Sequence, residues 1–142
     1  MHTINSISLA DARRVIDAGI AKAAEIGQPA NIAVADAGGN LLAFARMDDA
    51  WLGSIDIAIS KAFTSRAFNI ETGQLAAFAQ PGQQFYGINA SNHGRVMIFA
   101  GGIPLKAGNV VIGSVGVSGG TGAQDQAIAE AAVAALKKDA GA

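Results

Sequence analysis

Apolar and polar positions along this chain follow two different periods, and the changes of period mark its elements. After Ser8, apolar residues recur three or four positions apart: Leu9, Ala12, Ile16, Ile20 and Ala23. This spacing predicts an amphipathic helix that ends near Gly27. Ser8 with Asp11 three positions later resembles a capping box at its start.

Two apolar runs follow this helix, at 31–37 and 40–47, and a Gly-Gly-Asn turn joins them. Glycine and asparagine accept the positive φ angles that a tight turn requires, so we expect one antiparallel hairpin. Helical spacing returns at 54–68, and we expect a shorter helix at 71–79.

Apolar runs at 96–100, 103–106 and 110–117 predict three more strands, separated by Gly-Gly and Gly-Asn turn signals. Turns this short cannot serve as parallel crossovers, so the pattern predicts an antiparallel meander. Before it, 80–95 is the longest irregular stretch. After it, 123–138 has helical spacing.

The predicted order is helix, two strands, two helices, three strands and a last helix. A five-stranded antiparallel sheet covered by helices is an α+β layer architecture. The 142 residues fit one domain, 1–142, and a hydrophobic content of 51% is enough for a sizeable core.

Composition excludes several classes of protein. Ten basic and eleven acidic residues, without a charge run, predict no binding of nucleic acid or of an anionic membrane. The absence of cysteine excludes disulfides, thiolate metal sites and cysteine nucleophiles. No apolar run approaches the roughly 20 residues of a membrane span, and the N-terminus lacks a secretory signal pattern, so we expect a soluble cytoplasmic protein.

Several linked motifs occur in one order along the chain. They are VADAGGNLLAFARMDDAW, SKAFTSRAF, PGQQFYGI, FAGGIPL and GNVVIGSVGVSGGTGAQD. Together they resemble the GlcG/HbpS family of small haem-binding-type proteins, which is also seen as the C-terminal domain of PduO-type cobalamin adenosyltransferases. The resemblance covers nearly the whole chain and implies a profilin-like or roadblock-like fold. It also implies a homo-oligomer, as dimers that associate further.

Two classes of function are compatible with these features. In the first, the chain is a small-ligand-binding protein that takes haem or a related cofactor or metabolite in a pocket near a subunit interface, as the resemblance implies. In the second, it is a small catabolic enzyme of the lyase or isomerase type, acting on an oxygenated metabolite, as the GlcG name of the resembled family implies. A ligand-free oligomeric scaffold is a third possibility, since profilin-like folds also support that role.

Two side chains are candidates for contact with a haem iron. His93 is the only histidine outside the N-terminal segment, so it is the natural candidate for an iron ligand or proton carrier, and its alternative role is that of a surface histidine in a loop. Tyr86 can ligate ferric haem as a phenolate or orient a ligand. Its alternative role is packing under the FYGI turn.

Basic side chains are candidates for the mouth of the pocket. Arg46 can pair bidentately with a carboxylate such as a haem propionate, or simply end a strand with a solvated charge. Lys61 flanks the apolar stripe of the second predicted helix, where the family commonly places a similar residue. Arg95 is the third basic candidate. Trp51 can lie on a flat ligand or form part of the core.

Gly119, Gly120 and Thr121 lead the last predicted strand into the final helix. Unpaired N–H groups converge at a helix N-terminus, where a polar or anionic ligand group can dock. The alternative is that the glycines only permit a sharp turn and close packing. Ala123 departs from the family pattern, in which an acidic residue is common just before Gln-Asp, so no role of that carboxylate is carried over.

We predict the pocket between three segments: the irregular stretch at 83–95, the turn at 101–104 and the helix start at 119–121. These segments concentrate irregular backbone and unpaired donors. Lys61 or Arg46 of a neighbouring subunit would complete it.

Familiar catalytic constellations are missing from the sequence. A Ser-His-Asp triad would depend on His93, and no spacing singles out its partners. A zinc site of two or three histidines cannot be assembled from His2 and His93. General acid or base chemistry by Asp36, Asp48 or Lys61 needs only one or two perturbed groups, so whether the chain is an enzyme stays open.

Overall fold

The computed structural model describes the backbone of residues 1–140 and the side chains of residues 1–137. The elements, in chain order, are α1 (Leu9–Glu25), β1 (Asn31–Asp36), β2 (Leu41–Arg46), α2 (Gly53–Phe68), α3 (Thr72–Phe78), two short 3₁₀ turns η1 (Ile88–Ala90) and η2 (Asn92–Gly94), β3 (Gly102–Ala107), β4 (Val110–Ser118) and α4 (Gly122–Ala140).

The four strands form one antiparallel sheet in the order β2-β1-β4-β3. Two hairpins, β1–β2 and β3–β4, meet along the β1–β4 pair, in which Asn31 lies opposite Ser118. The two central strands are covered on both faces, so β1 is a continuous buried run rather than an alternating one.

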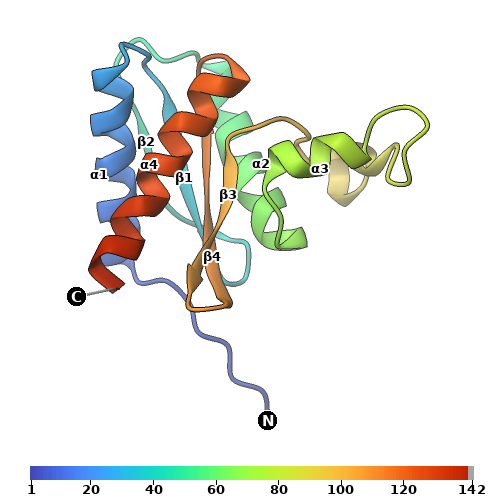
Figure 1. The fold of residues 1–142 in the computed structure, drawn as a ribbon, viewed down its shortest axis with the longest axis horizontal. Coiled ribbons are helices and arrows are strands. Elements are labelled where there is room, and N and C mark those ends of the chain that lie inside the picture. The colour runs from blue at the N-terminus through green and yellow to red at the C-terminus, as the bar shows by residue number, and fades with distance from the viewer. Residues whose placement is uncertain (141–142) are drawn as a thin grey trace.

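Helices cover both faces of this sheet (Figure 1). α1 and α4 lie side by side on one face and bury the larger apolar cluster, which includes Val15, Ile32 and Ile128. α2 covers the other face through a smaller cluster of short side chains, Ala33, Ala35, Ala58 and Ala62. The helix on that side therefore packs close to the strands.

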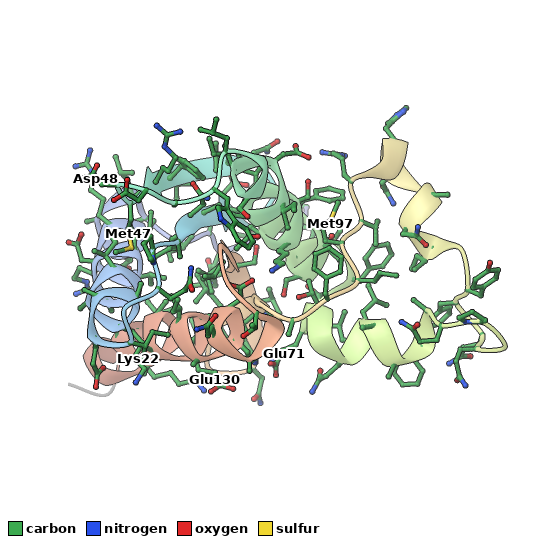
Figure 2. All side chains as sticks on the ribbon, turned by 90° about the horizontal axis from the view of Figure 1, so that it is seen from above. Lys22, Met47, Asp48, Glu71, Met97 and Glu130 are labelled. Carbon is green, nitrogen blue, oxygen red and sulfur yellow. The ribbon has the colours of Figure 1, made fainter. Side chains whose placement is uncertain are left out.

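α3 and the stretch that follows it project away from the layered body. We call residues 72–99 the arm. Figures 1 and 2 show the arm extending to one side, with Met97 on the part that returns to the body. Phe85 and Tyr86, both within the arm, are exposed. The return is tied to α2, because the hydroxyl of Thr64 accepts a hydrogen bond from the Met97 N–H at 2.9 Å and donates to the Ser60 carbonyl at 2.7 Å.

The prediction of five strands is wrong, because the sheet has four. The apolar run at 96–100 forms no strand. Val96 is buried, but the backbone there bonds to Thr64 of α2 rather than to a neighbouring strand. Gly101 then takes φ +125°, which a strand does not contain, and β3 begins one residue later. The meander is therefore a two-stranded hairpin.

The other predicted elements are present, with ends shifted by a few residues. Ser8 caps α1, since its hydroxyl oxygen accepts a hydrogen bond from the Asp11 N–H at 3.1 Å. The α+β class and the antiparallel pairing are confirmed. No helix in the described part of the chain has both the length and the hydropathy of a bilayer span.

Candidate functional site

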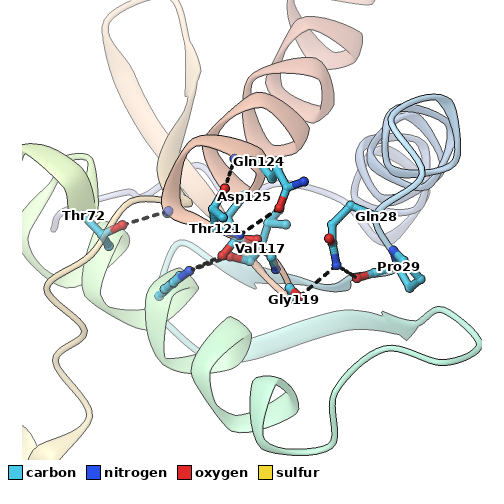
Figure 3. Close-up of polar contacts among 11 residues, drawn as sticks. Gln28, Pro29, Thr72, Val117, Gly119, Thr121, Gln124 and Asp125 are labelled. Atoms are coloured by element: carbon cyan, nitrogen blue, oxygen red, sulfur yellow. Dashed lines mark hydrogen bonds and ion pairs between the residues drawn. The ribbon is translucent and has the colours of Figure 1, made fainter.

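The most unusual side chain in the structure is a buried lysine on α2. Lys61 is only 1% exposed, because its side chain extends from α2 toward the end of β4. Its ammonium group donates to the Val117 carbonyl at 2.8 Å and to the Asp125 carboxylate at 3.0 Å (Figure 3). A buried lysine needs such partners, because an unpaired charge in the interior is very costly.

Asp125 lies in the first turn of α4, where a carboxylate is favoured by the helix dipole. One of its oxygens accepts the Lys61 hydrogen bond, and the other accepts the Gly120 N–H at 2.9 Å. Thr121 and Gln124 cap the same helix reciprocally, each side chain bonding the other's N–H. The pair therefore joins α2, the end of β4 and the start of α4.

Burial dominates the acid–base properties of this pair. Burial lowers the pKa of Lys61 from its ordinary 10.5, and the charge and hydrogen bond of Asp125 oppose that change. Burial likewise raises the pKa of Asp125 from 3.8, against the Lys61 charge and the Gly120 hydrogen bond. Both shifts favour the neutral forms, which is the expected effect of a low-dielectric environment.

A hollow of about 290 Å³ opens beside the pair. Its polar lining includes Lys61, Asp125 and the hydroxyls of Ser54 and Ser118, while its apolar walls include Trp51 and Phe99. The two serines are 4% and 5% exposed, and neither hydroxyl makes a hydrogen bond within the described residues. The remaining lining residues are Ile57, Ala100, Gly120 and Gly122.

Glycines allow the backbone to close around this hollow. A Cβ on Gly101 would lie 2.5 Å from the Val117 carbonyl oxygen and 2.9 Å from the Lys61 nitrogen. A Cβ on Gly119 would lie 2.6 Å from the carbonyl oxygen of Pro29. Close packing thus accounts for Gly119, in line with the simpler reading of the glycine run.

The candidates on the arm lie apart from the hollow. His93 and Tyr86 are exposed, and neither lines it. His93 has φ +58° within a run of three left-handed residues that includes Asn92 and Gly94. Arg95 is exposed, and its guanidinium stacks on the Phe63 ring at 3.8 Å from the centroid.

The remaining candidates divide between two separate hollows. Lys61 and Gly120 line the hollow, and Gly119 and Thr121 adjoin it in the chain. Arg46 lines a different, shallow hollow with Ile20, Met47 and Asp48. Figure 2 shows Met47 and Asp48 at the end of the molecule opposite the arm. Within one chain, Arg46 therefore does not join Lys61.

Sequence reasoning missed Asp125 and Phe99. An aspartate three residues after the glycine-rich run at 119–122, in the first turn of a helix, is a recognisable signal for Asp125. Its lysine partner lies 64 positions away, and no local pattern links the two. Among the described residues, no group of three or more His, Cys, Asp or Glu side chains is arranged to hold a metal ion.

Known proteins resemble the chain along nearly all of its length. An uncharacterised 15.0 kDa protein from the dhaT-dhaS intergenic region of Citrobacter freundii is 44% identical over 92% of both chains. The corrinoid adenosyltransferase PduO of Citrobacter freundii is 36% identical, also over 92% of this chain. The match spans only 39% of the length of PduO.

Solved structures share the fold. Klebsiella pneumoniae ORFY superposes with a TM-score of 0.94 at 39% identity, covering 96% of this chain and 94% of ORFY. A haem complex of PduOC superposes with a TM-score of 0.88 at 35% identity, covering 92% and 94% of the two chains. HbpS gives a TM-score of 0.84 at 27% identity over 94% and 92%.

The family model described as haem degrading protein HbpS-like matches residues 7–134. That range includes every element from α1 to most of α4, together with the whole of the hollow. The chain therefore belongs to the HbpS-like family.

Proposed function

We propose that this chain binds a small ligand, haem or a related cofactor or metabolite, in the hollow between α2 and the start of α4. The observation that carries the proposal is the hollow's construction. Apolar walls at Trp51 and Phe99 surround a buried ammonium–carboxylate pair, and polar groups that converge in an apolar pocket are typical of ligand sites.

The residues present fit haem when a second copy of the chain contributes. Trp51 and Phe99 offer aromatic surface to a flat ring, and Lys61 offers a cation. The hollow of one chain is smaller than a porphyrin, so the ring would extend to a neighbouring subunit. His93 or Tyr86 of that neighbour's exposed arm would then supply the axial ligand, and its Arg46 could pair with a propionate.

The relatives support this proposal. PduOC was crystallised as a haem complex, and 94% of its chain superposes on this one at 35% identity. The family description also refers to haem. We therefore take haem as the first ligand to test, and a homo-oligomer as the binding form.

A second candidate function is a small catabolic enzyme of the lyase or isomerase type. The observation that favours it is the Lys61–Asp125 pair, because two titratable groups with perturbed pKa values in one hollow are typical of acid–base catalysis. A bound metabolite in native mass spectrometry, combined with no haem spectrum, would support this candidate over the first.

Haem titration of the purified protein is the deciding experiment. We expect a Soret band, and we expect His93→Ala to shift it or to weaken binding at least about tenfold, or about 1.4 kcal/mol, if His93 is the axial ligand. Tyr86→Phe tests the phenolate, and His2→Ala is a matched control. An unchanged spectrum and affinity in His93→Ala would remove His93 from the site, and no Soret band at all would reject haem.

A further inference from the structure

We propose that the floor of this hollow is a carboxylate-binding site, formed by Lys61, Ser54, Ser118 and the first turn of α4. The inference names the chemistry of the ligand and rests on the proposed ligand-binding function. The carboxylate can belong to a small metabolic acid or to the edge of a larger cofactor, such as a haem propionate.

Hydrogen-bond donors in the hollow outnumber their acceptors. A lysine ammonium has three N–H groups, and only two are used, by Val117 and Asp125. The third has no acceptor among the described residues, and the Phe99 ring beside it is 5.4 Å away at its centroid. Buried donors without acceptors are costly, so this nitrogen is suited to an incoming oxygen atom.

The two serines add hydroxyl groups to the lining that contains the lysine. Ser54 lies in the first turn of α2 and Ser118 ends β4. Both line the hollow, with more than nine-tenths of their surface buried. Their hydroxyls have no partner in the described part of the chain. A carboxylate accepts about four hydrogen bonds through two oxygens, so it can use all three donors at once.

The start of α4 adds a favourable field. The N–H groups of Gly120 and Thr121 are already used by Asp125 and Gln124, but those of Gly122 and Ala123 have no partner among the described residues. The N-terminus of a helix carries roughly half a positive charge. Lys61 and Asp125 balance each other, so this partial charge favours an anion over a cation.

The volume and the walls limit the rest of the ligand. About 290 Å³ lies at the lower end of ligand pockets, which range from about 300 to 1,000 Å³. Trp51, Ile57 and Phe99 provide the large apolar side chains of the lining. The site therefore fits a small acid with a short apolar or planar tail, or one carboxylated edge of a larger ring.

Binding should be coupled to protonation of Asp125. A bound carboxylate brings a second negative charge near Asp125, and among the described residues Lys61 is the only other ionisable side chain that lines the hollow. Burial already raises the pKa of Asp125, so the added charge raises it further. Affinity for an ionised acid should therefore increase as the pH falls toward that pKa, provided that the acid itself stays ionised.

The test compares acids with their uncharged amides on the whole protein. We expect glycolate, propionate and benzoate to bind in calorimetric titrations, and glycolamide, propionamide and benzamide to bind at least about tenfold more weakly, because hydrogen bonds to charged groups are the stronger ones. Ser118→Ala should weaken acid binding by about three- to tenfold. Lys106→Met, which changes an exposed lysine outside the hollow, should leave binding unchanged.

Haem and haem dimethyl ester separate the two sources of the carboxylate. If free haem binds more tightly than its dimethyl ester, and Ser118→Ala loses affinity for free haem, the carboxylate is a propionate. If small acids bind and the two forms of haem do not differ in affinity, the carboxylate belongs to a metabolite. Lys61→Met should abolish the binding of haem and of small acids alike. If Lys61→Met does not fold, Ser118→Ala still tests the site.

Amides that bind as well as acids, or acids that bind equally to Ser118→Ala, would overturn the carboxylate site. If small acids do not bind, and haem binds equally well as its ester and to Ser118→Ala, the carboxylate site is wrong but the proposed ligand-binding function still stands.

Discussion

Gly116 of β4 lies directly against the main chain of α2, and a Cβ at this position would overlap the carbonyl oxygen of Ala58. The amide nitrogen of Ala62 would also lie only 2.5 Å from that Cβ. Backbone therefore meets backbone at this point between the sheet and α2, where the fully buried side chains of the contact are alanines.

Gly116→Ala should destabilise the protein by about 1–3 kcal/mol or more, because the added methyl group must push α2 away from the sheet. Urea denaturation measures the change in the free energy of unfolding. Gly53→Ala is the matched control: no atom lies within 4 Å of the added Cβ in the first turn of α2, so that variant should be neutral or slightly stabilised. Equal effects of the two substitutions would contradict this packing.

Removing one partner of the Lys61–Asp125 pair should cost about 3–5 kcal/mol, because the other charge is left buried without a counter-ion. Lys61→Met with Asp125→Leu removes both charges, and this double variant should be more stable than the sum of the single losses predicts. A double-mutant cycle by urea denaturation measures the difference. Additive losses would show that the two groups do not interact. The exposed pair Arg14–Asp11, treated in the same way, should give a coupling below about 1 kcal/mol.

The pH dependence of stability should carry the signature of Asp125. Its pKa is raised in the folded chain, so between 3.8 and the raised value the folded state holds a proton that the unfolded state has lost. The free energy of unfolding should therefore fall as the pH rises through that window and level off above it. Asp125→Asn should lack this decline, and a difference profile of the two proteins in urea tests it. If the free energy of unfolding of the wild type instead rises with pH relative to Asp125→Asn, the pKa of Asp125 is lowered in the folded chain and the prediction is wrong.

Much of the fold could be predicted from the sequence, because its signals are local. The spacing after Ser8, the Gly-Gly-Asn turn and the helical repeat of α2 each define an element without reference to the rest of the chain. The strand predicted at 96–100 is wrong for the same reason, because the prediction used only local signals. The run has the composition of a strand, but Thr64, more than thirty residues earlier, provides its backbone partner.

The candidate site was predictable only in part. The family resemblance pointed to Lys61, and the glycine run pointed to the start of α4, and both adjoin the hollow. The pairing of Lys61 with Asp125 depends on how α2 and α4 meet across the end of β4, which no spacing encodes. Charge alone likewise could not separate Arg46 from Lys61, although they lie in different hollows.

Thr64→Val should loosen the return of the arm. The substitution keeps the shape of the side chain but removes the acceptor of the part-buried Met97 N–H, and the loss of such a hydrogen bond costs about 1 kcal/mol. We expect faster hydrogen exchange at Met97 with little change in β1. Thr64→Ser keeps the hydroxyl and should exchange like the wild type. Equal protection of Met97 in the valine variant would show that this hydrogen bond does not order the arm.

The exposed aromatic groups of the arm predict self-association. Phe85 and Tyr86 are 45% and 69% exposed on a projecting segment, and apolar surface of this kind usually marks an interface. Light scattering at micromolar concentration should give a dimer or a larger assembly, and Phe85→Ser should shift it toward the monomer. Val110→Ser, at an equally exposed position on the β3–β4 hairpin, should not. A monomeric wild-type protein would contradict the prediction.

The thin layer between α2 and the sheet also sets the reach of the lysine. Lys61 extends from the same helix that Gly116 allows to approach β4, and at this spacing its nitrogen lies 2.8 Å from the Val117 carbonyl and 3.0 Å from the Asp125 carboxylate. A substitution that thickened this layer by one methyl group would withdraw the ammonium from its partners before the helix itself was lost. Ligand affinity should therefore respond to this packing more strongly than the melting temperature does. Mutations along α2 that lie far from the hollow can change ligand affinity by changing the separation between the helix and the sheet.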